Sequence, residues 1–228
     1  MDAAKVELMR ALGRLVRGLS ILVWGLPLTL FLYIETARTN WFGFLDDSAF
    51  VPALAGSVGL YYGLRQFHDF QKQERIWRQA LHRAEFFALL NTGLSPFLFW
   101  WHRFPAIPLY NTCLSVLALS VLIFLMQINE VLRRLCAMLP DEGLRAETNA
   151  FAEVNVGLFL VLFAGISLYL ALANVQAVPP LVNHMFSGEN PRGLWFVLFV
   201  GLMPLALTVA LLWKIKEVIF RSIIEAEH

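Results

Sequence analysis

Six apolar stretches constrain the fold of this chain more than any other feature of its sequence. They cover residues 18–34, 49–64, 86–101, 107–128, 154–175 and 194–213. A helix needs about 20 apolar residues, within a range of about 17–25, to cross the hydrocarbon core of a bilayer. The second and third stretches are slightly short, so we expect their helices to continue beyond the hydrocarbon. The pattern predicts an all-α integral membrane protein with six transmembrane helices.

The composition supports a bilayer rather than water as the solvent. Of the 228 residues, 58% are hydrophobic and 15% are charged, and the mean hydropathy is +0.63. Soluble domains carry about 25% charged residues, so six buried helices would leave too little polar surface for a soluble fold. The formal net charge is +1, which gives no reason to expect nucleic acid as a partner.

The lysine and arginine residues predict the orientation of the chain. If the N-terminus is cytoplasmic, 15 of the 18 basic residues fall on cytoplasmic segments, and the exceptions are Arg38, Arg103 and Arg192. Cytoplasmic loops of membrane proteins carry such an excess. We therefore expect both termini on the cytoplasmic side. We expect a bacterial inner membrane, because the chain is compact and has no long soluble loops.

The sequence divides into a short leading segment, residues 1–17, and a six-helix transmembrane domain, residues 18–228. In the leading segment, one helical face carries Leu8, Leu12, Leu15 and Val16, and another carries Arg10, Arg14 and Arg17. This pattern is typical of an amphipathic helix in the inner membrane interface, although an ordinary cytosolic extension fits as well. In the second part, we expect helical extensions on the cytoplasmic side.

Three cytoplasmic helix exits resemble one another, at residues 64–70, 125–131 and 212–218. They leave open a division of the domain into three helical hairpins. Every exit from a membrane needs an apolar-to-polar gradient, so the likeness also arises without duplication.

Small residues and prolines mark candidate contacts and hinges within the spans. Ala55, Gly59 and Gly63 recur at every fourth position and predict a helix-packing stripe. A proline frees a backbone carbonyl within a helix, and this makes hinge candidates of Pro27, Pro96 and Pro204.

Polar side chains gather near the cytoplasmic helix ends, and we name them the inner polar belt. The belt consists of Gln66, Asp69, Glu85, Asn91, Gln127, Glu130, Glu153, Asn155 and Glu217. A carboxylate at a helix N-terminus is stabilised by unpaired backbone N–H groups, which accounts for Glu85 and Glu153 without a function. The belt could also line an inner vestibule or dock a cytoplasmic partner.

Residues suited to catalysis are few. No Asp, Glu, Lys, Arg or His lies in the central two turns of any expected span, which counts against a proton pump or an ion-selective pathway. His82 and Glu85 form an isolated His-x-x-Glu pair, far short of a di-iron motif. No Gly-x-Ser-x-Gly, His-Glu-x-x-His or Cys-x-x-Cys motif occurs. We therefore predict no catalytic residue, no cofactor and no metal.

Three functional hypotheses follow. The leading one is a non-catalytic structural or accessory subunit, or an assembly factor, of a membrane protein complex. Its partners would be the lipid bilayer and other membrane subunits or further copies of this chain. The alternative is a transporter or channel for a neutral or amphipathic solute. A membrane-embedded enzyme with a site at His82, Glu85 and Glu130 is the least favoured.

Overall fold

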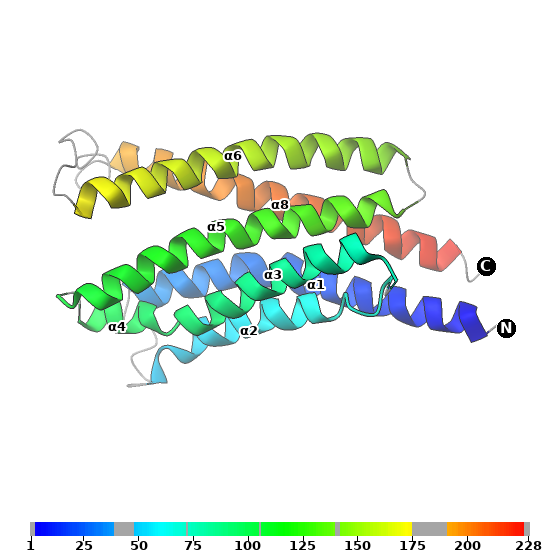
Figure 1. Ribbon diagram of the computed structural model, residues 1–228, viewed down its shortest axis with the longest axis horizontal. Coiled ribbons are helices and arrows are strands. Elements are labelled where there is room, and N and C mark those ends of the chain that lie inside the picture. The colour runs from blue at the N-terminus through cyan, green and yellow to red at the C-terminus, as the bar shows by residue number, and fades with distance from the viewer. Residues whose placement is uncertain are drawn as a thin grey trace.

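The computed structural model describes residues 3–38, 48–71, 73–104, 106–139, 142–174 and 191–225, which form seven helices and no strand (Figure 1). The helices are α1 (Ala3–Arg38), α2 (Val51–Arg65), α3 (Arg75–Leu94), α4 (Phe97–Arg103), α5 (Pro108–Ala137), α6 (Glu142–Asn174) and α8 (Pro191–Glu225). The prediction of an all-α chain is confirmed for these residues.

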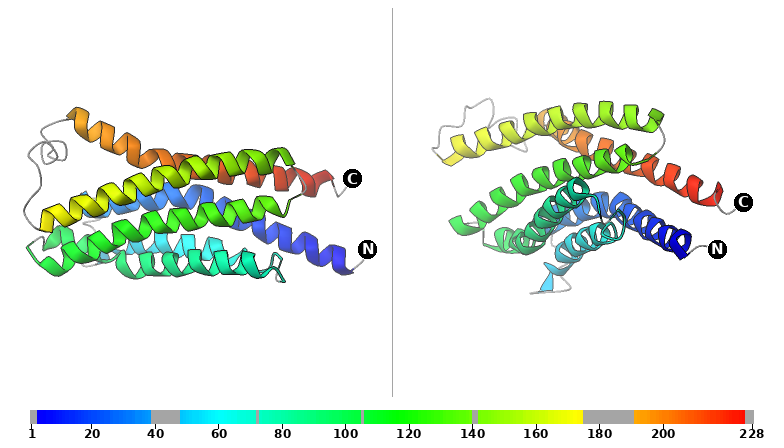
Figure 2. Two further views of the ribbon diagram at one scale, coloured as in Figure 1. Left: turned by 45° about the horizontal axis from the view of Figure 1, so that its top comes forward. Right: turned by 45° about the vertical axis from the view of Figure 1, so that its right-hand side comes forward.

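The long helices lie side by side along one axis, with both chain termini at the same end of the bundle (Figure 1). The α2–α3 and α5–α6 connections lie at that end too. Helix α1 packs along α2 and α8, whereas α5 packs along α3 and α6. Helices α2 and α3 therefore form one side of the bundle and α6 the other (Figure 2). The segments with most basic residues meet at one end.

Three described helical segments are long and apolar enough to cross a membrane: Met9–Ala37, Pro108–Ala137 and Arg145–Leu172. Helix α2 has 15 residues, so at about 1.5 Å per residue it is shorter than the hydrocarbon core of about 30 Å. The first half of α3 is charged. In α8, the side chains at 191–198 and 200 lie outside the described part. Six spans therefore remain a prediction.

The leading segment is not separated from the first span. Helix α1 runs without a break through Arg17 and Gly18. Leu15, Leu19 and Leu22 are fully buried, and their spacing continues one apolar stripe across the expected boundary. Arg14 forms an ion pair with Asp69 in the α2–α3 turn. The described part of the segment, from Ala3 onward, is thus the first part of α1, and it packs against the protein.

The third apolar stretch forms two helices, because α3 ends before Pro96 and α4 begins after it. Proline has no N–H to donate to the carbonyl of Thr92. The hydroxyl of Ser95, which is fully buried, donates to that carbonyl instead at 3.0 Å. The freed backbone group is therefore satisfied within the protein. Pro27 and Pro204 lie inside α1 and α8, which continue past them.

The main apolar core lies toward the end of the bundle that holds the termini. In the α2–α3 turn, the buried rings of Phe67 and Phe70 pack on buried Trp77, with ring centroids 6.2 and 6.0 Å from that of Trp77. The Trp77 Nε1 donates to the Phe70 carbonyl at 3.1 Å. Toward the other end, the described residues form only a small cluster of Ala53, Leu98 and Leu117.

A close helix contact joins α1 to α2. A Cβ added at Gly18 would lie 2.6 Å from the Gly63 carbonyl oxygen, and one at Gly63 would lie 3.0 Å from Ile21 Cγ2. A Cβ at Gly59 would meet no atom within 4 Å, and Ala55 is exposed. Of the proposed packing stripe, Gly63 therefore makes close contact with the same chain, while Gly59 and Ala55 lie beside this contact.

We predict that Gly18→Ala lowers the free energy of unfolding by about 1–3 kcal/mol, the usual cost of overpacking. The nearest atom is backbone and cannot rotate away. Gly13→Ala, in the same helix with open space around it, is the matched control and should be neutral or stabilising by up to about 1 kcal/mol. Thermal unfolding in detergent measures both. Equal stability of the two variants would contradict the close contact.

Candidate functional site

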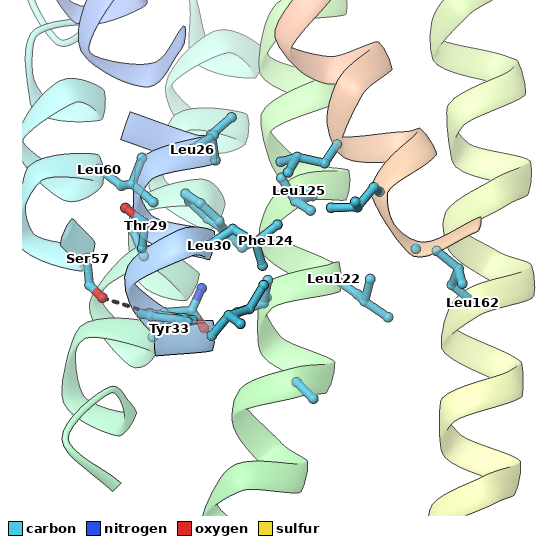
Figure 3. A pocket seen from close by; sticks show the side chains of 18 of the residues that line it. Leu26, Thr29, Leu30, Tyr33, Ser57, Leu60, Leu122, Phe124, Leu125 and Leu162 are labelled. Carbon is cyan, nitrogen blue, oxygen red and sulfur yellow. Dashed lines mark hydrogen bonds between the residues drawn. The ribbon is translucent and has the colours of Figure 1, made fainter. Parts of the chain in front are cut away.

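A cavity of about 290 Å³ lies among the helices, next to the main core (Figure 3). Side chains from α1, α2, α3, α5, α6 and α8 line it. Most of them are aliphatic, and the polar ones are Thr29, Tyr33, Ser57 and Asn91. Among the described residues that line the cavity, none carries a carboxylate or a basic group. The cavity is therefore suited to an uncharged, largely apolar molecule.

The rim of the cavity reaches the outer surface of the bundle between three helices. Ile34 of α1 is 37% exposed and Leu202 of α8 is 44% exposed. Ala118 of α5, which also lines the cavity, is exposed as well. The apolar lining therefore continues to exposed apolar side chains on three helices.

Asn91 lines the cavity with a carboxamide of which only one half is hydrogen-bonded to a described residue. The residue is 5% exposed, and its Oδ1 accepts a hydrogen bond from the Ser120 hydroxyl at 2.5 Å. Its Nδ2 bonds to no described residue, yet it is not fully enclosed. One half of the carboxamide can therefore bond to a molecule in the cavity.

The other polar side chains of the lining are turned to neighbours. The Tyr33 and Ser57 hydroxyls are 2.7 Å apart, and Ser57 also donates to the Ala53 carbonyl at 2.9 Å (Figure 3). The Thr29 hydroxyl has no partner among the described residues. A Cβ added at Gly56 would lie 2.9 Å from it, so this hydroxyl lies against α2.

A second polar group of residues joins α5, α6 and α8 inside the bundle. The Asn155 Nδ2 lies within hydrogen-bonding distance of Asn129 Oδ1 (3.0 Å) and Thr208 Oγ1 (2.9 Å). Asn129 Nδ2 contacts the same Thr208 oxygen at 2.8 Å. Thr208 in turn donates to the Pro204 carbonyl at 2.8 Å. These buried bonds hold three helices in register, and one of them uses the hinge candidate Pro204.

Most residues of the inner polar belt belong neither to the cavity nor to the group of Asn129, Asn155 and Thr208. Three of its carboxylates form ion pairs with arginines. Asp69 pairs with Arg14, and Glu217 pairs with Arg221. Glu130 pairs with both Arg133 and Arg134. Gln66 caps α2, Gln127 is half-buried on α5, Glu153 is exposed on α6, and Glu85 contacts His68 and His82. The belt is thus divided: Asn91 faces the cavity, Asn155 joins the network, and the carboxylates mostly pair locally.

Sequence reasoning missed Tyr33, Asn129 and Thr208. Asn129 carried a usable signal, because it lies on the same helical stripe as buried Leu125 and Leu132. A polar side chain on a buried stripe needs a polar partner inside the protein. For Thr208 and Tyr33 no comparable pattern stands out in the sequence.

Comparisons with known proteins gave no match to a protein-family model, a curated protein or a solved structure. The chemistry of the cavity is therefore inferred from its own side chains.

We predict that Asn155→Ala lowers the free energy of unfolding by about 1–2 kcal/mol, the range for hydrogen bonds between membrane helices. The substitution removes the amide that links α6 to Asn129 and Thr208. Asn149→Ala is the control, because Asn149 is exposed on the same helix. Unfolding in detergent should separate the two variants. If both behaved like the unmodified protein, the network would not stabilise the fold.

Proposed function

We propose that the protein is a membrane carrier that binds a neutral amphipathic solute between its helices. The observation that supports this function is the cavity, which has an apolar lining and one half-paired carboxamide at Asn91. Small-molecule sites usually have volumes of about 300–1,000 Å³. At about 290 Å³, the cavity is suited to one alkyl chain or a short isoprenoid rather than a large ligand.

The lining also limits the polar part of the solute. An ion buried without a partner costs several kcal/mol, and none of the described lining residues offers an opposite charge. A hydroxyl or carbonyl group, by contrast, can bond to the free end of the Asn91 carboxamide. We therefore favour an aliphatic alcohol, aldehyde or ketone over a fatty acid or an amine.

The proposal includes six membrane crossings, with α3 and α4 together forming one broken crossing. Both termini and the two connections at their end of the bundle would be cytoplasmic (Figure 1). The basic residues of those segments support this orientation, and a bacterial inner membrane fits it. In this arrangement the apolar rim at Ile34, Ala118 and Leu202 opens into lipid, from which an amphipathic solute can enter.

A second candidate function is the accessory subunit or assembly factor. It is favoured by α6, which packs along α5 and α8 and exposes Val154, Leu160, Val161 and Leu168. Lipid can cover this face, and so can another membrane subunit.

We predict that Asn91→Leu weakens binding of a long-chain alcohol about tenfold, which corresponds to the loss of one hydrogen bond of about 1.4 kcal/mol. The probe is a photoactivatable dodecanol analogue, compared with its carboxylate and ammonium counterparts on the purified protein. Ser120→Ala is the matched control, because it breaks the same Asn91–Ser120 bond but keeps the amide. It should bind the alcohol normally.

Ala118→Phe should block the cavity and abolish labelling by the alcohol without unfolding the protein, because Ala118 lies at the exposed rim. Equal labelling of the Ala118→Phe variant and the unmodified protein would refute the cavity as the binding site. If no probe binds and the protein copurifies with other membrane chains in fixed stoichiometry, the accessory-subunit function is favoured instead.

The topology predicts opposite labelling of two engineered cysteines. In a chain carrying Cys113→Ser and Cys136→Ala, which removes both native thiols, Ala106→Cys should react with a membrane-impermeant maleimide in intact cells. Gln73→Cys should react only after permeabilisation. Both positions are exposed; Gln73 lies between α2 and α3 and Ala106 between α4 and α5, and these two connections are at opposite ends of the bundle (Figure 1). Labelling of both in intact cells would contradict an odd number of crossings between them.

A further inference from the structure

Two histidines and a carboxylate meet at the end of the bundle that holds the termini. The Glu85 side chain is only 11% exposed. Its Oε1 lies 2.6 Å from His68 Nε2, and its Oε2 lies 3.4 Å from His82 Nδ1. One ligand atom from each of the three residues fits within a span of 4.8 Å.

The fold positions these side chains without help from an ion. His82 and Glu85 are three residues apart on α3, so they share a helix face. His68 lies in the α2–α3 turn, between Phe67 and Phe70, whose rings are buried against Trp77. The apolar core therefore holds the turn, and with it His68, against α3.

We propose that His68, His82 and Glu85 bind one divalent transition-metal ion, with Zn²⁺ as the best fit. Zinc accepts imidazole nitrogen and carboxylate oxygen at about 2.0–2.2 Å, and tetrahedral geometry places neighbouring ligand atoms about 3.3 Å apart. The two distances between histidine nitrogens and Glu85 oxygens, 2.6 and 3.4 Å, lie on either side of that value. Small side-chain rotations would therefore bring the ligand atoms into a tetrahedral arrangement. Two histidines and one carboxylate leave a fourth position for water or another ligand.

The ligand atoms, two imidazole nitrogens and one carboxylate, favour a transition metal over Ca²⁺ or Mg²⁺, which need several oxygen ligands. Glu85 is the carboxylate of the cluster, and basic side chains lie nearby. Arg75, Arg78 and Arg83 line a shallow groove with His82. Such an environment does not attract cations by charge, so binding depends on the affinity of imidazole nitrogen for the metal.

Two further cations near the cluster are held by other partners. Arg14 pairs with Asp69, and Arg65 donates to the Tyr61 hydroxyl at 3.3 Å. That hydrogen bond raises the pKa of Arg65 above its ordinary value, and the Glu85 carboxylate adds a smaller contribution. Among the described ion pairs, Glu85 is paired with the two histidines and with neither of these arginines.

The sequence alone did not predict this site, because His82 and Glu85 form only an isolated pair. His68 lies 17 residues before Glu85 and joins them only through the fold. Glu130, which the least favoured enzyme hypothesis grouped with His82 and Glu85, pairs instead with Arg133 and Arg134. The metal would link the α2–α3 turn to α3, independently of any solute in the cavity.

The test is Co²⁺ binding, followed by visible absorption, to the full-length protein without a histidine tag, in detergent and after chelator treatment. We expect one Co²⁺ per chain, displaced by Zn²⁺. His82→Ala and Glu85→Gln should weaken binding by at least about 10- to 100-fold, the cost of removing even an outer partner of a metal ligand. His102→Ala, an exposed histidine on α4, should bind like the unmodified protein.

If the unmodified protein binds no Co²⁺ or Zn²⁺, or if His82→Ala binds as tightly as it does, the proposal is refuted and the cluster is a histidine–carboxylate ion pair only. His82→Ala decides the matter even if Glu85→Gln fails to fold. The His82 side chain is 63% exposed, so its removal leaves the core intact.

Discussion

The contact between α1 and the end of α2 sets the geometry on which the rest of the bundle depends. Gly18 lets the two backbones approach, with Phe67 packed beside it. Trp77 then closes the turn that brings α3 back along α2. The large buried side chains gather around this point, whereas the other end holds a small cluster at Ala53, Leu98 and Leu117. Firm packing at one end and sparse packing at the other leave room for the cavity between them.

Polar groups inside the bundle serve mainly to satisfy one another, as an environment without water requires. Ser95 replaces the donor that Pro96 lacks, and Thr208 bonds to the carbonyl of Pro204. Asn129 and Asn155 share that threonine. Against this background, two described lining residues differ: the Asn91 carboxamide is half-paired, and the Thr29 hydroxyl has no described partner. A site of this kind is suited to holding and orienting a neutral molecule, because its described lining is mostly aliphatic and includes one half-paired carboxamide.

Much of the helical architecture could be predicted from the apolar stretches, because their length and composition depend on nothing but the chain itself. The partners of each polar residue could not, because they come from distant segments. Asn155 meets Asn129 across 26 residues and Thr208 across 53. The stripe at Ala55, Gly59 and Gly63 has the spacing for close packing, but spacing does not reveal which glycine faces α1. The proline at position 96 predicted a hinge in the helix. The hydrogen bond from Ser95 to the Thr92 carbonyl could not be predicted, because it depends on local geometry.

The glycine contact also determines how α1 can move. Sliding this helix along its axis by one turn, about 5.4 Å, would bring Arg14 or Leu22 to the place where Gly18 contacts α2, so the close contact opposes such a shift. Beyond the contact, Pro27 leaves the carbonyl of Val23 without its usual helical donor, and a helix bends most easily at such a point. The cavity-lining residues Leu30, Tyr33 and Ile34 all follow Pro27. The part of α1 before Pro27 is therefore held by the contact with α2. The part after Pro27 lines the cavity and can bend more easily, so the cavity can change shape without loss of that contact.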